Sequence, residues 1–368
     1  MHVLVTADTI GGVWTYTKEL VTGLVRRGVH VTLVSFGDIP TAAQTDWIEV
    51  LQNVDFRPTA FRLEWMQEAE QDIDSSREFL LSVIRETKPD VLHFNQFCYG
   101  SLNVDLPKVV VAHSDVLSWW RSVKNEIPGD IPWLRWYRCA VLDGLRGATT
   151  VIAPSRWMLR QIEMLYGSPA QSAVIHNGRT PTQFNPHISK DDYVLSVGRI
   201  WDAGKQVGLL AEVESASPIF VVGAEQHADQ SSRTIRSFPA SGKVCVKGTQ
   251  SEAQLRHWYS RASIYAATSR YEPFGLAPLE AAFSRCALLA NDIPSFREIW
   301  GDTACYFQAN DASSLQQQIE RLRVDRMLRM TYANLAYNRA RERYTADRMV
   351  DEYMRLYQAK MSAGALAA

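Results

Sequence analysis

Short runs of apolar, mostly β-branched residues alternate along the chain with longer stretches whose apolar residues recur at helical spacing. The first run is Val3–Thr6. It is followed by Val13–Arg27, in which Leu20 and Leu24 fall on one helical face, and by Gly28, where a glycine commonly ends a helix. This alternation predicts βαβ units and parallel sheets.

The first half of the chain continues this alternation. We expect strands at Val3–Thr6, His30–Ser35, Val91–Phe94, Lys108–Ala112, Thr149–Ala153 and Gln171–Ile175, and helices at Val13–Arg27, Asp74–Thr87 and Pro132–Arg146. The turn His176-Asn177-Gly178 and the polar, aperiodic stretch Arg179–Asp192 then interrupt the pattern. We therefore expect a first domain over residues 1–178.

The alternation restarts after this boundary. We expect strands at Tyr193–Val197, Ile219–Val222, Lys243–Val246, Ser263–Ala266 and Ala287–Leu289, and helices at Lys205–Ser215, Ser251–Arg261 and Pro278–Ser284. Two such sets predict an α/β protein of two Rossmann-like domains facing a central cleft, the second over residues 179–344. The tail Thr345–Lys360 carries an apolar stripe that includes Met349 and Tyr353, so we expect it to dock as a helix.

Composition narrows the class of protein. The 368 residues are 46% hydrophobic and 21% charged with a net charge of −1, which is ordinary for a soluble protein and argues against a nucleic-acid binder. The N-terminus has no basic leader, and no stretch approaches the ~18 apolar residues of a membrane span. The five scattered cysteines indicate neither a disulfide framework nor a zinc site. We expect a cytoplasmic protein with at most peripheral membrane contact.

The first candidate motif, Asp8–Trp14, follows the first predicted strand and opens the first helix. Gly11 and Gly12 would let the backbone approach a ligand closely, and the amides of the helix start attract anions. The spacing fits neither a dinucleotide fingerprint nor a Walker loop, and an ordinary tight turn is an equal alternative.

The second motif places two cations around a loop at the end of a strand. The strand ends at Gly198, and Arg199 and Lys205 then flank a short loop. Cations at the carboxyl edge of a parallel sheet are well placed to neutralise a diphosphate, although two solvated surface cations would give the same pattern.

The third motif, Arg270–Ala282, combines two carboxylates with an irregular loop. Glu272 precedes the predicted helix and Glu280 lies on it, while Pro273 and Gly275 shape the loop so that its amides can donate to a ligand. An ionised carboxylate only accepts hydrogen bonds, which suits hydroxyl-rich ligands such as a sugar or a ribose.

Taken in order, these motifs resemble the retaining, nucleotide-sugar-dependent glycosyltransferases of family 4. The resemblance rests on Gly11-Gly12, on Gly198-Arg199 with Lys205, on the Glu272-x₇-Glu280 pattern and on Val174–Gly178. It implies the GT-B fold, with an active site in the cleft and a C-terminal helix, residues 345–368, that crosses back to the first domain.

The resemblance also implies a role for each matching residue. Gly12 would bind the donor phosphate, Arg199 and Lys205 would stabilise the leaving diphosphate, and Glu272 would bind hydroxyls of the donor sugar. The remaining donor contacts would come from Gly11, Gly198, Gly248, Thr249, Phe274, Gly275, Leu276 and the ribose ligand Glu280, with His113 as the active-site histidine. Lys205 stands one residue later than in the usual family pattern.

Aromatic residues supply the candidates for the acceptor side. Trp14, Trp119 and Trp120 lie in the expected acceptor region and could stack on a sugar ring, with core packing an equal alternative. Asp72-Ile73-Asp74 has the spacing of a D-x-D metal motif but lies in a polar segment far from the nucleotide motifs.

We therefore expect a retaining transfer of a sugar from a UDP- or GDP-sugar to the hydroxyl of a sugar or small molecule, with no metal or other cofactor. A nucleotide-sugar epimerase on the same fold is the first alternative. An NAD-dependent oxidoreductase and a non-catalytic sugar-nucleotide sensor follow, and the missing G-x-G-x-x-G pattern disfavours the oxidoreductase.

Overall fold

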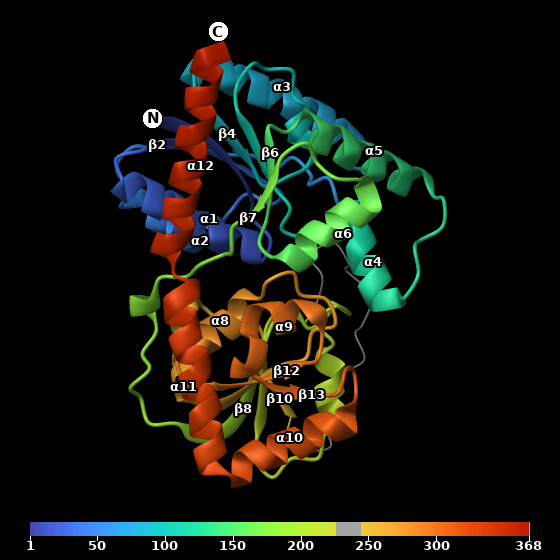
Figure 1. Cartoon of the computed structure of the whole chain (residues 1–368), viewed down its shortest axis with the longest axis vertical. Helices are drawn as coiled ribbons and strands as arrows, with labels where there is room; N and C mark the ends of the chain where they lie inside the picture. Colours follow the sequence, from blue (N-terminus) through green and yellow to red (C-terminus); the bar gives the residue numbers. More distant parts are fainter. Residues whose placement is uncertain (226–243, 368) are drawn as a thin grey trace. The chain divides into compact units, whose positions relative to one another are not determined.

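The computed structural model describes residues 1–225 and 244–367 and divides the chain into two compact units (Figure 1). The first unit comprises residues 1–120, 126–178 and 346–368, and the second comprises residues 121–125 and 179–345. Lys243, the first residue of one predicted strand, lies outside the described residues.

The first unit is built on a seven-stranded parallel sheet in the order β3-β2-β1-β4-β5-β6-β7. Its strands are β1 (His2–Asp8), β2 (His30–Phe36), β3 (Val54–Pro58), β4 (Val91–Phe94), β5 (Lys108–Val111), β6 (Thr150–Ala153) and β7 (Ser172–Val174). The strand order reverses between β1 and β4. At such a switch point the loops beyond the carboxyl ends of the strands diverge and leave room for a ligand.

Helices cover both faces of this sheet because neighbouring strand residues point to opposite sides. Leu4 packs with α3 (Glu70–Thr87), α5 (Pro132–Gly147) and α6 (Arg156–Tyr166), whereas Val3 and Val5 pack with helices on the other face. That other face is covered by α1 (Gly12–Arg26), α2 (Ala42–Glu49) and the C-terminal helix α12 (Ala346–Ala367). The 3-10 helix η1 (Cys98–Ser101) and α4 (Val116–Lys124) complete the helices between β4 and α5.

The C-terminal helix α12 belongs to the first unit, as the sequence predicts. Met349, Val350, Tyr353 and Tyr357 are fully buried in the core that α12 shares with α1. The two helices approach closely at Gly23, where an added Cβ would lie 2.5 Å from Val350 Cγ2.

The second unit repeats this topology with a six-stranded parallel sheet in the order β10-β9-β8-β11-β12-β13. Its strands are β8 (Asp191–Val197), β9 (Ile219–Val222), β10 (Val244–Val246), β11 (Ala262–Ala267), β12 (Ala287–Asn291) and β13 (Cys305–Phe307). Here the order reverses between β8 and β11, so this unit has a switch point of its own.

The helices of the second unit also form two layers. Leu195 packs with a core that includes residues of α7 (Glu252–Arg261), α8 (Leu276–Phe283), α9 (Pro294–Trp300) and α11 (Arg326–Arg343). Val194 packs on the opposite face with α10 (Ala312–Val324) and the 3-10 helix η3 (Val207–Glu212). Two further 3-10 helices are η2 (Pro181–Gln183) and η4 (Gly301–Thr303).

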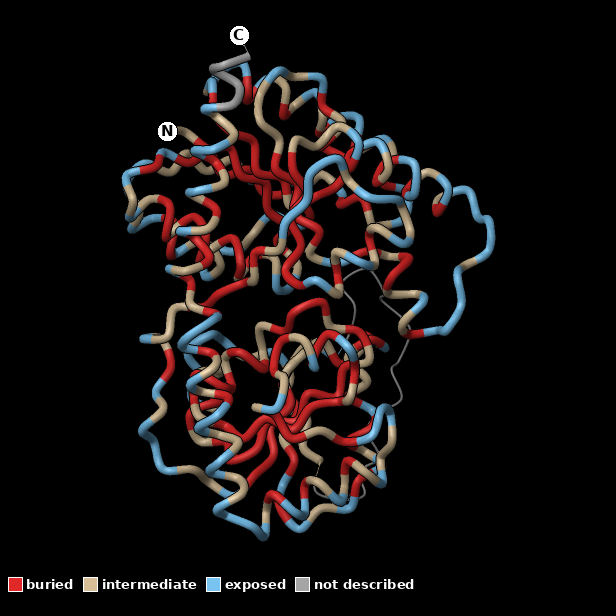
Figure 2. Tube along the Cα trace, in the orientation of Figure 1, coloured by how far each residue is buried: buried red, intermediate tan, exposed pale blue. Residues whose placement is uncertain are grey.

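Burial explains why the strands are continuous apolar runs in the sequence. Every residue of the inner strands β6, β11 and β12 is buried, whereas β3 and β10, at the sheet edges, contain no buried residue. Figure 2 shows the buried residues, in red, gathered along the strands in the middle of each unit. Strands covered by helices on both faces have no solvent-facing side and therefore need no polar alternation.

The predicted fold class, two Rossmann-like α/β domains, is confirmed, and β4 and β9 span the predicted residues. The predicted helix Lys205–Ser215 is wrong, because only the shorter 3-10 helix η3 forms there. Gln206, the residue before η3, has a φ of 48°, a left-handed conformation that a right-handed helix cannot include.

Candidate active site

The carboxyl edge of the second unit's sheet brings the second and third sequence motifs together. The loop after β8 carries Gly198, Arg199 and Lys205, and the loop after β11 carries Ser269 and Glu272. These loops leave the two strands that flank the switch point, which is where a ligand binds in an open α/β sheet.

Lys205 and Glu272 form the central contact of this edge. Lys205 Nζ donates to Glu272 Oε2 at 2.5 Å, and the Ser269 hydroxyl donates to the same oxygen at 3.2 Å. The two charged side chains are 23% and 13% exposed. They also line a small cavity together with Ser269 and Thr268. The predicted phosphate cation and the predicted sugar carboxylate therefore neutralise each other in this structure.

Backbone hydrogen bonds hold the two loops in register. Gly204 O accepts from the amides of Arg270 and Tyr271 at 2.9 and 3.3 Å, and the Thr268 hydroxyl donates to Lys205 O at 2.9 Å. These bonds fix the backbone of Lys205 relative to the β11 loop, which reduces the conformational entropy that the loop can lose on binding a ligand.

Arg199 is placed by a contact within its own loop. Its Nη2 donates to Asp202 Oδ2 at 2.9 Å, and its guanidinium lies over the Trp201 ring at 5.0 Å from the centroid. Asp202 Oδ1 also accepts from the Gly204 amide at 2.8 Å. The Arg199 side chain is 40% exposed, so it remains accessible to an anion at this edge.

Glycines follow the neighbouring strands β8, β9 and β10, Gly198 and Gly223 directly and Gly248 after one intervening residue. The Gly198 amide donates to Val222 O, and the Gly223 amide donates to Gly248 O, both at 2.9 Å. A Cβ on Gly223 would lie 1.8 Å from Gly198 O, and the φ of Gly223 is 150°. Gly223 was not predicted as a site residue, although its position directly after the apolar run Ile219–Val222 is a signal for it. Gly248 has a φ of 64°, and the neighbouring Thr249 is exposed.

The start of α8 completes this edge of the second unit. Gly275, the residue before α8, has a φ of 93°, and a Cβ there would lie 2.8 Å from Pro278 Cγ. Only glycine fits this turn, which presents the first amides of α8, beginning with Leu276. Phe274 is instead buried, with its ring packed edge-on against Tyr344.

Glu280, the predicted ribose ligand, is held by a buried arginine. Arg179 Nε lies 2.9 Å from Glu280 Oε1, and the two side chains are 4% and 13% exposed. This ion pair orients the Glu280 carboxylate on α8. Arg179 is a second residue that the sequence analysis missed, since it lies 101 positions earlier in a segment interpreted as a linker.

The first unit places the glycine motif at its own switch point. Gly11 has a φ of 84° directly before α1, whose first residue is Gly12. The turn is fixed because Asp8 Oδ1 accepts from the Ile10 amide at 2.6 Å, and the Thr9 hydroxyl donates to Phe36 O at 3.1 Å. The amides at the start of α1 therefore form a positively polarised end at this sheet edge.

His113 follows β5 at the same edge of the first sheet. Its Nε2 lies 2.9 Å from Asn95 Oδ1, and Asn95 follows the neighbouring strand β4. The Tyr16 ring of α1 packs edge-on against the imidazole at 4.5 Å. Loss of hydration and the nearby His93 lower the pKa of His113 to about 3, so the ring is neutral at pH 7.

The three candidate tryptophans differ in their surroundings. Trp14 is buried, its Nε1 donates to Gln44 O at 3.1 Å, and its ring packs on Trp47, so its position favours core packing over contact with an acceptor. Trp119 and Trp120 are half-buried on α4 with their rings edge-on at 6.0 Å. Their acceptor role stays a prediction.

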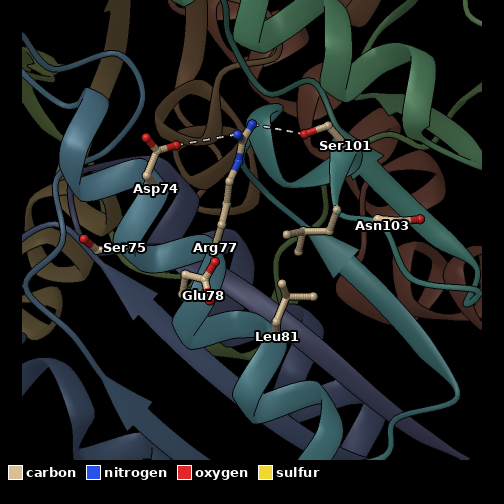
Figure 3. Close-up of a pocket in the computed structure, with 8 residues that line it drawn as sticks. Asp74, Ser75, Arg77, Glu78, Leu81, Ser101 and Asn103 are labelled. Carbon is tan, nitrogen blue, oxygen red and sulfur yellow. Dashed lines mark hydrogen bonds and ion pairs between the residues drawn. The ribbon is translucent and has the colours of Figure 1, made fainter.

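A separate surface hollow of about 490 Å³ lies between α3 and the η1 segment, and no predicted site residue lines it. Figure 3 shows Arg77 extending across it between Asp74 and Ser101, to which its guanidinium donates at 3.0 Å. Asp72 and Asp74 are engaged by protein groups, because Asp72 Oδ2 accepts from the Arg62 amide at 2.8 Å and Asp74 pairs with Arg77.

The described residues contain neither a grouped metal-ligand set nor a helix that could span a membrane. Within residues 1–225 and 244–367, no three His, Cys, Asp or Glu side chains are grouped to hold a metal ion. Across the same residues, no helix combines the length and the apolar character needed to span a bilayer.

Both halves of the chain match known glycosyltransferase families. Residues 10–183 match Glycosyltransferase Family 4, and residues 180–339 match Glycosyl transferases group 1. Together the two matches span residues 10–339, and the chain belongs to the family 4 glycosyltransferases. The resemblance drawn from the sequence motifs is thereby confirmed, and the matches give no support to the epimerase alternative.

Two curated relatives of this glycosyltransferase are mannosyltransferases. The chain is 31% identical over 231 residues to the lipopolysaccharide core biosynthesis mannosyltransferase LpcC of Rhizobium leguminosarum bv. viciae, covering 53% of this chain and 64% of the relative. It is 27% identical over 154 residues to the O-antigen chain mannosyltransferase RfbU of Salmonella typhimurium, covering 41% and 44%. The chain thus spans less than two thirds of the length of each.

Solved structures of similar fold cover nearly the whole chain. Sucrose-phosphate synthase from Thermosynechococcus elongatus superposes with a TM-score of 0.81 at 17% identity, covering 99% of this chain and 100% of that one. Anabaena HepE in complex with UDP and glucose gives 0.75 at 15% identity, covering 98% and 100%. At these identities the likeness establishes the GT-B fold.

Proposed function

We propose that this glycosyltransferase moves a sugar from a nucleoside diphosphate sugar to a hydroxyl group of a carbohydrate acceptor, with retention at the anomeric carbon. The observation that carries the proposal is the Lys205–Glu272 contact at the switch point of the second unit. It joins a cation suited to a diphosphate and a carboxylate suited to sugar hydroxyls at the edge where such folds bind ligands.

The main chemical task is to stabilise the diphosphate as it leaves. Lys205 and Arg199 stand at the same loop, and both side chains retain exposed surface. Fixed cations aimed at a developing negative charge stabilise the transition state more than the ground state. When the diphosphate takes over Lys205, the Glu272 carboxylate is released to accept hydrogen bonds from sugar hydroxyls.

The route that we propose is a front-face displacement. The acceptor hydroxyl attacks the anomeric carbon from the side that the diphosphate leaves, and a phosphate oxygen of the leaving group takes the acceptor proton. This route uses no nucleophilic side chain and assigns charge stabilisation to Arg199 and Lys205, so we also propose that the reaction needs no metal ion.

The identity of the donor is proposed from the relatives. The structure of HepE with UDP and glucose favours a UDP-sugar, and the mannosyltransferase relatives favour a hexose as the transferred group. Those two relatives also favour a growing polysaccharide or glycolipid as the acceptor. The five cysteines form no disulfide, which agrees with a reducing cytoplasm as the place of reaction.

A donor screen tests the proposal. We expect a UDP- or GDP-hexose to raise the thermal unfolding temperature, because a ligand at 100 times its Kd stabilises by about 2.7 kcal/mol. Lys205→Ala should weaken binding and lower transfer at least ~10²-fold. Stabilisation by NAD but by no nucleotide sugar would contradict the proposal, as would near-normal turnover by the Lys205→Ala variant.

A further inference from the structure

The surface hollow between α3 and η1, called here the α3–η1 hollow, has a volume of about 490 Å³. Pockets that hold a small molecule have volumes of roughly 300–1,000 Å³. All residues that line the hollow belong to the first unit, and none of them is a predicted site residue. The candidate active site therefore leaves this hollow without a function.

The α3–η1 hollow lies toward the edge of the first sheet at which α/β folds bind ligands. Because α3 connects two parallel strands, β3 and β4, it runs back along the sheet and begins at the carboxyl ends of the strands. Asp74 and Glu78 lie in the first half of α3, and η1 follows the carboxyl end of β4. The hollow is thus on the same edge of the sheet as the Gly11 turn.

The two walls of the hollow are held together by hydrogen bonds within the protein. The buried Ser76 hydroxyl of α3 lies 2.9 Å from the Tyr99 hydroxyl of η1. Arg77 Nη2 donates to Cys98 O at 3.2 Å and to the Ser101 hydroxyl at 3.0 Å. Figure 3 shows the Arg77 side chain reaching from α3 toward Ser101. A hollow with walls fixed in this way loses little conformational entropy when a ligand enters.

The lining of the hollow combines apolar surface with unpaired polar groups. Leu81 and Leu102 supply the apolar part, and Ser75, Glu78 and Asn103 supply exposed polar side chains. Within residues 1–225 and 244–367, these three polar side chains have no hydrogen-bond or ion-pair partner. A carboxylate accepts hydrogen bonds, whereas a hydroxyl and an amide both donate and accept. A sugar fits this set, because its C–H groups can pack on the leucines while its hydroxyls pair with the polar groups.

The charge of the lining favours an uncharged ligand. Its charged groups are the carboxylates of Asp74 and Glu78 and the Arg77 guanidinium, two negative and one positive, for a net charge of −1. The guanidinium is already engaged by η1, so an anion would mainly face the two carboxylates. In the part of the chain that the structure describes, these carboxylates belong to no group of three potential metal ligands.

We propose that the α3–η1 hollow is a second carbohydrate site, which binds an uncharged oligosaccharide segment of the acceptor. The choice of ligand rests on the proposed function, because an enzyme that extends a carbohydrate chain meets such a segment in every cycle. A segment bound in the hollow keeps the rest of its chain at the enzyme, which raises the effective concentration of the chain end. The site should therefore lower the KM for a long acceptor.

Binding is tested on the whole chain without any donor. The probes are mannotriose and maltotriose, and the readout is the side-chain amide signals of Asn103 in a ¹H–¹⁵N spectrum, assigned by their loss in Asn103→Ser. We expect at least one of the two trisaccharides to shift these signals, and the anionic trigalacturonate to bind at least about tenfold more weakly. Glu78→Gln should keep the trisaccharide affinity within about threefold, because the Gln amide oxygen still accepts a hydrogen bond.

A pair of serines on α3 gives a matched control. Ser75→Trp should fill the hollow and weaken trisaccharide binding at least about tenfold. Ser82→Trp changes an exposed serine seven positions later on the same helix that does not line the hollow, and it should leave binding unchanged. The double variant Glu78→Ala, Asn103→Ala removes two hydrogen-bonding groups without adding bulk, and calorimetry should show about a tenfold loss of affinity.

Kinetics with acceptors of different length tests the role of the site. Ser75→Trp should raise the KM for a long acceptor about tenfold and leave transfer to a monosaccharide acceptor unchanged. No shift at Asn103 with either neutral trisaccharide, tighter binding of trigalacturonate or of spermidine, or an equal loss of affinity in Ser82→Trp would overturn the proposed site. An unchanged KM in Ser75→Trp would overturn its role in holding the acceptor. Absence of turnover with every donor would instead refute the proposed function, while the spectra would still decide whether the hollow binds a saccharide.

Discussion

A double-mutant cycle on the Lys205–Glu272 ion pair measures how strongly the two side chains stabilise each other. Two unit charges 4 Å apart attract by about 4 kcal/mol at an effective dielectric constant of about 20, and desolvation offsets much of this. The side chains are only 23% and 13% exposed, so removing one charge leaves the other partly buried without its partner. We expect Lys205→Met and Glu272→Gln each to lower the free energy of unfolding by about 2–3 kcal/mol.

The double variant separates stability from catalysis. Because it strands no charge, we expect it to lose only about 1–2 kcal/mol, which gives a coupling energy of about 2 kcal/mol or more between the two sites. Its transfer rate should nevertheless stay at least ~10²-fold below wild type, since both the phosphate cation and the sugar carboxylate are gone. Thermal or urea unfolding gives the stabilities, and donor consumption gives the rates. Additive stability losses within about 0.5 kcal/mol would refute the structural coupling.

Three further predictions follow from other parts of the structure. Gly223→Ala should destabilise the second unit by more than about 3 kcal/mol or prevent its folding, because the new Cβ would lie 1.8 Å from Gly198 O. Gly208→Ala is the matched control: the space around its Cβ is open, so the unfolding free energy should change by less than about 0.5 kcal/mol. Arg179→Met should lower the free energy of unfolding by about 3 kcal/mol, because it removes the buried cation that is paired with Glu280. The double variant Arg179→Met, Glu280→Gln should recover part of that lost stability. Burial lowers the pKa of His93 from 6.5 to about 3, so as the pH falls the unfolded chain takes up a proton at His93 before the folded chain does. The free energy of unfolding should therefore fall below about pH 6.5, by about 2 kcal/mol at pH 5 from this residue. His93→Gln should make the free energy of unfolding less dependent on pH, and an unchanged dependence would show that His93 is not its source.

The strand pattern could be predicted because burial on both faces makes strands continuous apolar runs. Ile219–Val222 is such a run, and Val91–Phe94 is interrupted only by the buried His93; both form strands over the predicted residues. The edge strand β3 (Val54–Pro58) was missed because it is only partly buried and ends in a proline, so it carries no continuous apolar signal. The helical spacing of Leu315, Ile319 and Leu322 in α10 is a signal that the sequence analysis did not use.

Local conformation was harder to predict than periodicity. The apolar spacing after Lys205 suits a helix, but the left-handed Gln206 leaves only the short η3. The helices α2, α4, α6, α9 and α11 were likewise not predicted. These helices are stabilised mainly by packing on the sheets, and such tertiary contacts can override a weak local helix propensity, which is all that the sequence shows.

The chemistry of the site was only partly accessible to sequence analysis. Motif order points to Lys205 and Glu272, but nothing in the sequence indicates that these residues, 67 positions apart, bind each other. Asn95 belongs to no motif, because a lone asparagine after a strand is common in turns. Its contact with His113 exists only because the topology makes β4 and β5 neighbours.

The anomeric configuration of the product decides whether the enzyme transfers the sugar with retention. The whole chain is incubated with an α-linked UDP- or GDP-hexose and a carbohydrate acceptor, and the new linkage is followed by NMR. We predict an α-linked product whose formation falls at least ~10²-fold in Lys205→Ala. A β-linked product, or a donor that binds and is never transferred or hydrolysed, would contradict this prediction.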